Sequence, residues 1–215
     1  MSLVGRKVLI SLGGTFEAID SVRGITNNSS GKMGLELAKQ AYIRGADLTL
    51  IVANVSVRIP SMFNIIKVQS THEMYDVIED IIPDFDIFIA TAAVSDFAVE
   101  ESINSKISSD NSIDLTFKPT VKIIRQIKKL NPHIFLVGFK AEFNITEEEI
   151  IKCALKQIEK AGTDLVVAND VGIENSGFGS DCNEVLLIDD NVLKIPLTSK
   201  KEIACKVFDV IVDKI

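Results

Sequence analysis

The sequence predicts one α/β domain over residues 1–215, a Rossmann-like three-layer sandwich with a mostly parallel sheet and a C-terminal β-hairpin at the sheet edge. Two observations support this fold class. Short runs rich in β-branched residues alternate with longer amphipathic segments, the pattern of parallel strands joined by crossover helices. A hydrophobic content of 47% over 215 residues is also enough to fill one core, so a single domain is expected.

The parallel strands are expected in six apolar segments, at residues 7–13, 47–53, 64–70, 86–93, 134–141 and 164–170. Between them, apolar residues recur at steps of three and four, which predicts helices at residues 32–44, 72–82, 121–130 and 146–161. Near the C-terminus, "NEVLLIDD" and "VLKIPLTS" are separated by little more than Asp190 and Asn191, which favours a hairpin. A last helix is expected at residues 200–214. Residues 113–119 resemble a further strand, and the polar stretch 100–111 before it is expected to be a mobile loop.

The composition excludes several classes of protein. A formal net charge of −7 argues against a general nucleic-acid binder, because such affinity rests on clustered Lys and Arg. No apolar run reaches the roughly 18 residues of a membrane helix, and no signal peptide opens the chain. The three cysteines lack the spacing of a metal site or disulfide framework, and Cys153 and Cys205 are expected to be buried thiols. A reduced, cytoplasmic protein without nucleic-acid or membrane partners is therefore expected.

In an open α/β sheet, ligands bind beyond the carboxyl ends of the strands. Four segments expected there are rich in Gly, Ala, Asp or aromatic residues: "SLGGTFEAID", "TAAVSDF", "VGFKAEF" and "VANDVGIENSGFGSD". The first lacks the G-x-G-x-x-G spacing of a dinucleotide fingerprint, and Ala53 and Asn54 stand where an acidic residue would end the second strand. Tyr42 and Tyr75 also lack the Tyr-x-x-x-Lys partner of many reductases. An NAD(P)-binding reductase is therefore the weaker alternative.

The stretch "NNSSGKMG" ends one loop and opens the helix predicted from Lys32. Ser29 or Ser30 is expected to cap that helix and to leave backbone N–H groups for an anion such as a phosphate. Gly31 and Gly34 are expected to allow a ligand or the neighbouring strand to approach closely. An ordinary helix cap with glycines for packing is the alternative on this run alone.

Four basic residues near these loops are of interest: for Arg23 and Lys106 a surface residue is the alternative to an anion ligand, and for Lys160 the alternative is the favourable electrostatic position of any lysine at a helix C-terminus. Arg23 lies in a loop of a dozen or more residues, long enough to suggest a function, where its guanidinium could form two hydrogen bonds to an anion. Lys106 stands alone in the polar loop after "AAVSDF". Lys156 and Lys160 are four residues apart and so share one face of a helix.

Taken in order, these segments resemble the phosphopantothenoylcysteine synthetase family, the ligase step of coenzyme A biosynthesis. The resemblance covers nearly the whole chain and includes "GGTFEAID", "VRGITNNSSGKMG", "AAVSDF" followed ten residues later by Lys106, "VGFKAE", "DLVVAND" and "GFGSDCNEVLLI". Its most specific part is "ITNNSSGKMG", which is close to the family's Ser-Asn-His-Ser-Ser-Gly-Lys-Met-Gly.

The resemblance implies that 4′-phosphopantothenate and L-cysteine are joined by an amide bond through an acyl-cytidylate, with CTP as the nucleotide and Mg²⁺ as the metal. ATP is the alternative nucleotide, because the eukaryotic members use it. Catalytic roles are implied for Asn27 at the acyl intermediate, for Arg23 in the same site and for Lys106 on a flexible flap, whereas the metal ligands stay unassigned. The implied nucleotide-binding positions are Gly14, Ser30, Gly31, Met33, Ala90, Thr91, Ala92, Asp96, Lys106, Pro119, Thr120, Val121, Lys122, Phe139, Lys156 and Lys160.

The resemblance also implies partners. Family members dimerise through extra strands, so a homodimer is expected, formed by residues 113–118 or by the C-terminal hairpin. Many prokaryotic members are fused behind a flavin-dependent decarboxylase, which is the expected fused or separate partner. Two departures from the family pattern stand out: the flap reads "KISS" instead of Lys-Ile-Lys-Lys, and "KPTV" places Thr120 where the family has an acidic residue. A binding module that has lost the chemistry is the alternative that these departures raise.

Overall fold

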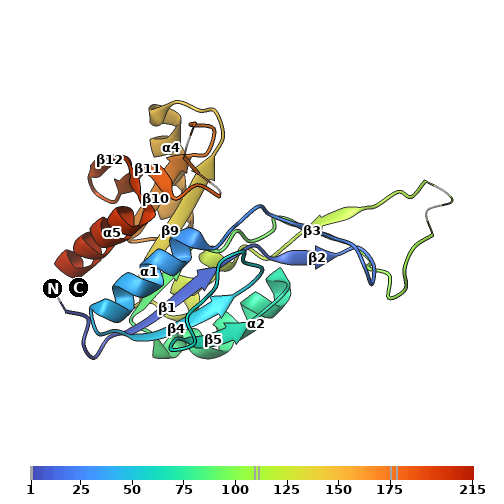
Figure 1. The fold of residues 1–215 in the computed structure, drawn as a ribbon, viewed down its shortest axis with the longest axis horizontal. Helices are drawn as coiled ribbons and strands as arrows, with labels where there is room; N and C mark the ends of the chain where they lie inside the picture. The colour runs from blue at the N-terminus through green and yellow to red at the C-terminus, as the bar shows by residue number, and fades with distance from the viewer. Residues whose placement is uncertain (1, 109, 111, 175, 178) are drawn as a thin grey trace.

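The computed structural model describes residues 2–108, 110, 112–174, 176–177 and 179–215. The strands of its central sheet are β1 (Lys7–Leu12), β4 (Asp47–Val52), β5 (Asn64–Lys67), β6 (Ile87–Ala90), β9 (Phe135–Glu142), β10 (Leu165–Asp170), β11 (Cys182–Ile188) and β12 (Val192–Ser199). They lie in the order β12-β11-β10-β9-β6-β1-β4-β5 (Figure 1). Neighbours from β10 to β5 run parallel, whereas β11 and β12 pair antiparallel at the edge. The predicted sheet and its C-terminal hairpin are confirmed.

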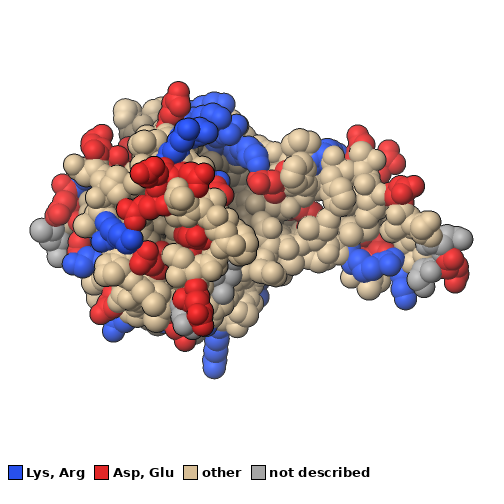
Figure 2. Space-filling model, turned by 90° about the horizontal axis from the view of Figure 1, so that it is seen from above, with Lys and Arg blue, Asp and Glu red and all other residues tan. Residues whose placement is uncertain are grey.

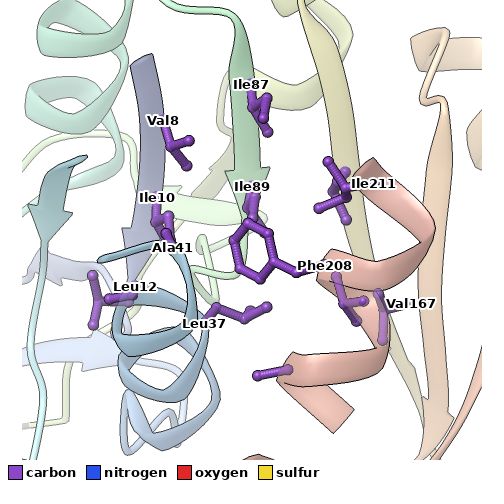
Figure 3. Close-up of a cluster of buried hydrophobic side chains, with 14 of the residues drawn as sticks. Val8, Ile10, Leu12, Leu37, Ala41, Ile87, Ile89, Val167, Phe208 and Ile211 are labelled. Carbon is purple, nitrogen blue, oxygen red and sulfur yellow. The ribbon is translucent and has the colours of Figure 1, made fainter. Parts of the chain in front are cut away.

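Helices cover both faces of this sheet. They are α1 (Lys32–Ile43), α2 (Thr71–Ile81), α3 (Ile127–Leu130), α4 (Glu147–Ala161) and α5 (Lys200–Lys214), with the 3-10 turns η1 (Ile82–Asp84) and η2 (Ile123–Arg125). The helices α1 and α5 pack on one face, and α2, α3 and α4 pack on the other. Figure 3 shows Phe208 of α5 beside Leu37 of α1 and Ile89 of β6 in the first of these layers. Because both faces are covered, β1 and β4 are buried along almost their whole length.

The prediction of one helix over residues 121–130 is wrong at its start. The structure has η2 followed by the single turn α3, and Lys122 before them is not helical. The contacts of Thr120 explain why the helix starts later in the chain than predicted. Its N–H donates to the carbonyl of Asp96 at 3.0 Å, and its hydroxyl donates to the carbonyl of Ser95 at 2.5 Å. These bonds hold the chain extended where the helix was expected to begin.

Two antiparallel strand pairs project from the globular part (Figure 1), and we call these strands and the segments that join each pair the arm. The first pair is β2 (Phe16–Ala18) with β3 (Gly24–Thr26), and the second is β7 (Phe97–Val99) with β8 (Phe117–Pro119). The first pair replaces most of the long loop predicted after β1. It forms because Gly24 has no side chain, since a Cβ there would lie 2.2 Å from the ring of Phe16.

The second strand pair of the arm contains only the end of a strand that the sequence predicts. The strand predicted at residues 113–119 is confined to β8, its last three residues. The described residues of the stretch 100–111 form no helix or strand of their own, apart from an isolated bridge between Ile103 and Asp20. Residues 109 and 111 of the predicted mobile loop lie outside the described residues.

The cysteines are less buried than expected. All three are free and half-buried, so the prediction of buried thiols at Cys153 and Cys205 is wrong. Cys153 borders a cavity, and the guanidinium of Arg44 lies 3.7 Å from the sulfur of Cys205 at the junction of α1 and α5. Within the described part of the chain, none of the helices has both the length and the apolar character needed to cross a membrane.

Candidate active site

A cavity of about 890 Å³ opens at the carboxyl ends of four parallel strands, where the strand-end rule predicted a ligand site. Its lining includes Ser11 in β1, Ala90 in β6, Phe139 in β9 and Asn169 in β10. Residues of the first turn of α1 and of the last turns of α4 complete the wall. The cavity therefore spans the strand ends from the α1 face of the sheet to the α4 face.

Positive charge dominates this cavity. Among the described residues, seven basic and two acidic ones line it, although the whole chain has a net charge of −7. Figure 2 shows Lys and Arg side chains gathered along the rim of a hollow in the globular part. Such an excess of one charge in a concave site attracts ligands of the opposite charge, which favours an anionic ligand. The basic residues are Lys32, Lys122, Arg125, Lys140, Lys156, Lys160 and Lys200, and the acidic ones are Asp96 and Glu142.

The mouth of α1 has the expected position but not the expected cap. Gly31, in the left-handed conformation with φ of 78°, is the N-cap residue, so the prediction of a serine cap is wrong. The hydroxyl of Ser30 accepts only a long hydrogen bond, 3.4 Å, from the N–H of Lys32. Close approach at both glycines is confirmed, because an added Cβ would lie 2.5 Å from Val55 at Gly31 and 2.5 Å from Leu12 at Gly34.

Asn27 lies in the cavity wall beside this mouth. Its side-chain nitrogen donates to the carbonyl oxygens of Ala93 and Val94, each at 3.2 Å. The loop after β6 thereby fixes the orientation of the amide, and Oδ1 is the atom that can accept a hydrogen bond from a ligand.

The loop after β6 also joins the "KPTV" segment. The ammonium of Lys122 forms an ion pair with the carboxylate of Asp96 across this junction. Thr120, which departs from the family pattern, holds the backbone of Ser95 and Asp96 as described above. The threonine therefore has a structural contact that an acidic side chain at this position would change.

The α4 end of the cavity carries the predicted lysine pair. Lys156 and Lys160 both line it, together with Phe139 below them. A Cβ at Gly138 would lie 2.0 Å from Nε2 of Gln157, so the missing side chain lets α4 lie close to the sheet. This nitrogen is buried and has no hydrogen-bond partner among the described residues, although Gln157 borders the cavity.

Five predicted site residues lie outside the cavity lining: Gly14, Arg23, Lys106, Pro119 and Thr120. The N–H of Gly14 donates to the carbonyl of Asn54 at 2.9 Å. Arg23 and Lys106 belong to the arm. The structure thus brings together the other predicted residues but separates these two cations from them.

Asp20 explains where Arg23 points. The buried carboxylate of Asp20 accepts a hydrogen bond from the guanidinium of Arg23. It also accepts hydrogen bonds from the backbone N–H groups of Val22 (2.8 Å), Arg23 (2.7 Å) and Ile107 (3.1 Å). The guanidinium also donates to the carbonyl of Ile107 at 2.9 Å. The bond from Arg23 outweighs the cost of burial and holds the pKa of Asp20 well below its usual range. This cluster anchors the residue that follows Lys106.

Residues 3–215 match the family described as the DNA/pantothenate metabolism flavoprotein C-terminal domain. The chain belongs to this family. It is 46% identical over 212 residues to the coenzyme A biosynthesis bifunctional protein CoaBC of Thermococcus kodakarensis, a match that covers 97% of this chain and 51% of that protein. The chain thus spans about half the length of the curated relatives it matches.

The solved structures that are similar to this member of the family include the following two. One is the DNA/pantothenate metabolism flavoprotein from Streptococcus pneumoniae, with 28% identity and a TM-score of 0.86 over 96% of this chain and 98% of that chain. The other is the C-terminal domain of a coenzyme A biosynthesis bifunctional protein CoaBC, with 28% identity and a TM-score of 0.81 over 97% and 95% of the two chains. The α/β fold described above is therefore the fold of this domain family.

The cavity carboxylates could hold a Mg²⁺ ion only together with phosphate oxygens of a ligand. The described residues contain no group of three His, Cys, Asp or Glu side chains that could hold a metal. The two cavity carboxylates are paired, Asp96 with Lys122 and Glu142 with Lys140. Because Mg²⁺ keeps several waters and often binds through one carboxylate plus substrate phosphates, Asp96 and Glu142 are the two cavity side chains that could each supply one such ligand.

The sequence predictions leave out several residues that the structure shows to matter, among them Asp20 in the arm and Lys32, Lys140 and Lys200 in the cavity wall. Asp20 left a local signal in "DSVR", because an Asp side chain commonly accepts bonds from backbone N–H groups two and three residues later. Lys200 has no such local signal in the sequence, because its burial depends on the loop of Gly177 and Ser180, which lies elsewhere in the chain.

Proposed function

We propose that this domain is a phosphopantothenate-cysteine ligase, an acid-amino-acid ligase that makes 4′-phosphopantothenoylcysteine in coenzyme A biosynthesis. Its substrates are 4′-phosphopantothenate, L-cysteine and CTP, and its by-products are CMP and pyrophosphate. The observation that carries this proposal is the basic cavity at the strand ends, whose lining includes Asn27, Asp96 and the first turn of α1. The relatives named for coenzyme A biosynthesis support it.

A carboxylate is a poor acyl donor, so the ligase must activate it first. A carboxylate oxygen of 4′-phosphopantothenate attacks the α-phosphorus of CTP, the bond to the bridging oxygen breaks, and pyrophosphate leaves. The deprotonated amine of cysteine then attacks the acyl carbon of the acyl-cytidylate, and CMP leaves with the electrons of the broken C–O bond. The sulfur takes no part in either step.

The side chains of the cavity match these steps. Lysines neutralise the charge that builds on the phosphates during the first step. A Mg²⁺ ion bound to the nucleotide would neutralise more of this charge. Lys122, Phe139, Lys156 and Lys160 are proposed nucleotide contacts. Asn27, held by the loop after β6, is proposed to accept a hydrogen bond from the amine of cysteine through Oδ1 and so to orient it toward the acyl carbon.

The arm is proposed to bind a second copy of the chain. Large apolar side chains are exposed along it, including Phe97, Ile103, Ile113 and Phe117. Arg23 and Lys106, both implied in catalysis by the resemblance, lie on the arm and outside the cavity of their own chain. A homodimer that packs arms together would bury the apolar surface and bring these cations toward a cavity.

A flavin-dependent decarboxylase is the proposed functional partner, either fused or separate, because the matched CoaBC proteins are bifunctional and twice as long. The cytoplasm is the proposed compartment, where three free cysteines stay reduced.

Pyrophosphate release tests the proposed function and its nucleotide together. The assay contains Mg²⁺ and 4′-phosphopantothenate with CTP or ATP, each with and without cysteine. Product formation that requires cysteine and prefers CTP is expected. Preference for ATP would keep the ligase and overturn the choice of CTP. No release by folded protein with either nucleotide would contradict the enzyme and leave a nucleotide-binding module.

The reductase alternative receives no support from the site. Neither Tyr42 nor Tyr75 lines the cavity, and the hydroxyl of Tyr75 is bonded to Glu79. A fluorescence titration with NADPH is expected to show no binding in the range where CTP binds.

A further inference from the structure

One cation at the cavity is far more buried than the others. Lys200, the first residue of α5, is 5% exposed, and its ammonium donates to the carbonyl oxygens of Gly177 at 2.9 Å and Ser180 at 2.6 Å. Both acceptors are uncharged. A buried cation without a bonded carboxylate destabilises the folded protein relative to an apolar side chain of similar size, because the charge has lost its hydration. Packing alone therefore gives no reason for a lysine at this position.

A second cation lies close to the first. Lys32, the first residue of α1, donates to the carbonyl of Gly179 at 2.6 Å and to the carboxylate of Asp181 at 2.7 Å. Burial and, next, the charge of Lys32 lower the pKa of Lys200, whereas Asp181 acts in the opposite direction. Asp181 thus pairs with Lys32 and acts on Lys200 only at longer range, and its carboxylate is mostly exposed to water.

The surroundings add to this excess of positive charge. The helices α1 and α5 pack side by side and begin at these two lysines, so the partial positive charges of both N-termini fall at the same place. The neighbouring wall of the cavity is polar, with the amide of Asn169 donating to Asn183 at 3.3 Å. Because α1 and α5 cover the opposite face of the sheet from α4, this cluster is separate from the lysine pair of α4.

We propose that Lys32 and Lys200 form a phosphoryl-binding subsite at the α1 end of the cavity. Each ammonium has three N–H donors, so it can keep a loop carbonyl and still bind a phosphate oxygen. The proposal deepens the ligase function and rests on it. The phosphoryl group comes either from the pyrophosphate part of the nucleotide or from the 4′-phosphate of phosphopantothenate.

Direct binding of inorganic pyrophosphate tests the subsite without any turnover. Isothermal titration calorimetry compares the wild type with Lys32→Met, Lys200→Met and Lys200→Arg, and with Lys201→Met, an exposed neighbour that does not line the cavity. Each cavity methionine variant is expected to bind pyrophosphate at least about tenfold more weakly, because one charged contact is lost. Lys200→Arg is expected to keep most of the affinity and Lys201→Met all of it. Unchanged affinity in both cavity methionine variants would overturn the proposal.

The source of the phosphoryl group is read from KM values. In the ligase assay, a raised KM for CTP in the Lys32→Met and Lys200→Met variants assigns the subsite to the nucleotide, and a raised KM for 4′-phosphopantothenate assigns it to the other substrate. A lower melting temperature with unchanged KM values and unchanged pyrophosphate affinity would show a structural role only and refute the subsite. If Lys200→Met does not fold, Lys32→Met carries the test, because its side chain is partly exposed.

Failure of the subsite can be told apart from failure of the ligase. A wild type that turns over, with variants that match it, keeps the ligase and refutes the subsite. A wild type that binds pyrophosphate through both lysines but never ligates cysteine keeps the subsite and refutes the proposed reaction.

Discussion

At the scale of single residues, the proposed chemistry depends most directly on Asn27. Replacing Asn27 by Ala removes Oδ1 together with the bonds to Ala93 and Val94, while the cationic side chains of the cavity remain. The variant is expected to bind CTP within about twofold of the wild type but to form product about 100-fold more slowly, because misplaced reactants lose that much rate. Equilibrium titration and steady-state product release measure the two quantities. Parallel loss of affinity and rate would contradict a role confined to the chemical step.

At the scale of elements, the packing of α1 against β1 decides the position of the α1 N-terminus, the proposed anion-binding site. An added Cβ at Gly34 would lie 2.5 Å from Cβ of Leu12 and 2.6 Å from Oγ1 of Thr91, which is itself bonded to the carbonyl of Ser11. Helix propensity alone predicts that Gly34→Ala stabilises the protein by about 1 kcal/mol. Overpacking costs about 1–3 kcal/mol, so we expect a net loss of unfolding free energy in urea titrations. A gain in stability would show that α1 can move away from the sheet.

At the scale of the whole molecule, the arm extends from a compact α/β body and exposes apolar rings (Figure 1). The Phe117→Asp variant is expected to convert the proposed dimer to a monomer in analytical ultracentrifugation, because a charge in an apolar interface is poorly solvated. Ile43→Asp is the matched control: Ile43 is 72% exposed at the end of α1, away from the arm, and its replacement should leave the dimer intact. A monomeric wild type, or a Phe117→Asp dimer, would reject the arm as the interface.

Local patterns determined most of the fold. Apolar residues with helical or continuous strand periodicity need no distant partner to be recognised, so the segments at β1, β4, α1 and α4 were predicted to within one residue at each end. The exceptions have tertiary causes. The hydrogen bonds of Thr120 to the loop after β6 keep the chain extended, so the helix begins later than predicted. The close contact of Phe16 with Gly24 allows two strands to pair where a loop was expected.

The sequence by itself determined the sheet, the strand ends that form the cavity and the residues there that belong to recognisable motifs, such as Asn27 and Lys156. These follow from the chain order, because parallel strands bring their carboxyl ends to one edge. Only the tertiary structure decided the charge balance of the cavity, the burial of Lys200 and the pairing of Arg23 with Asp20. Each of these depends on segments far apart in the chain that meet in space, and electrostatic interactions depend on that separation and on burial rather than on sequence spacing.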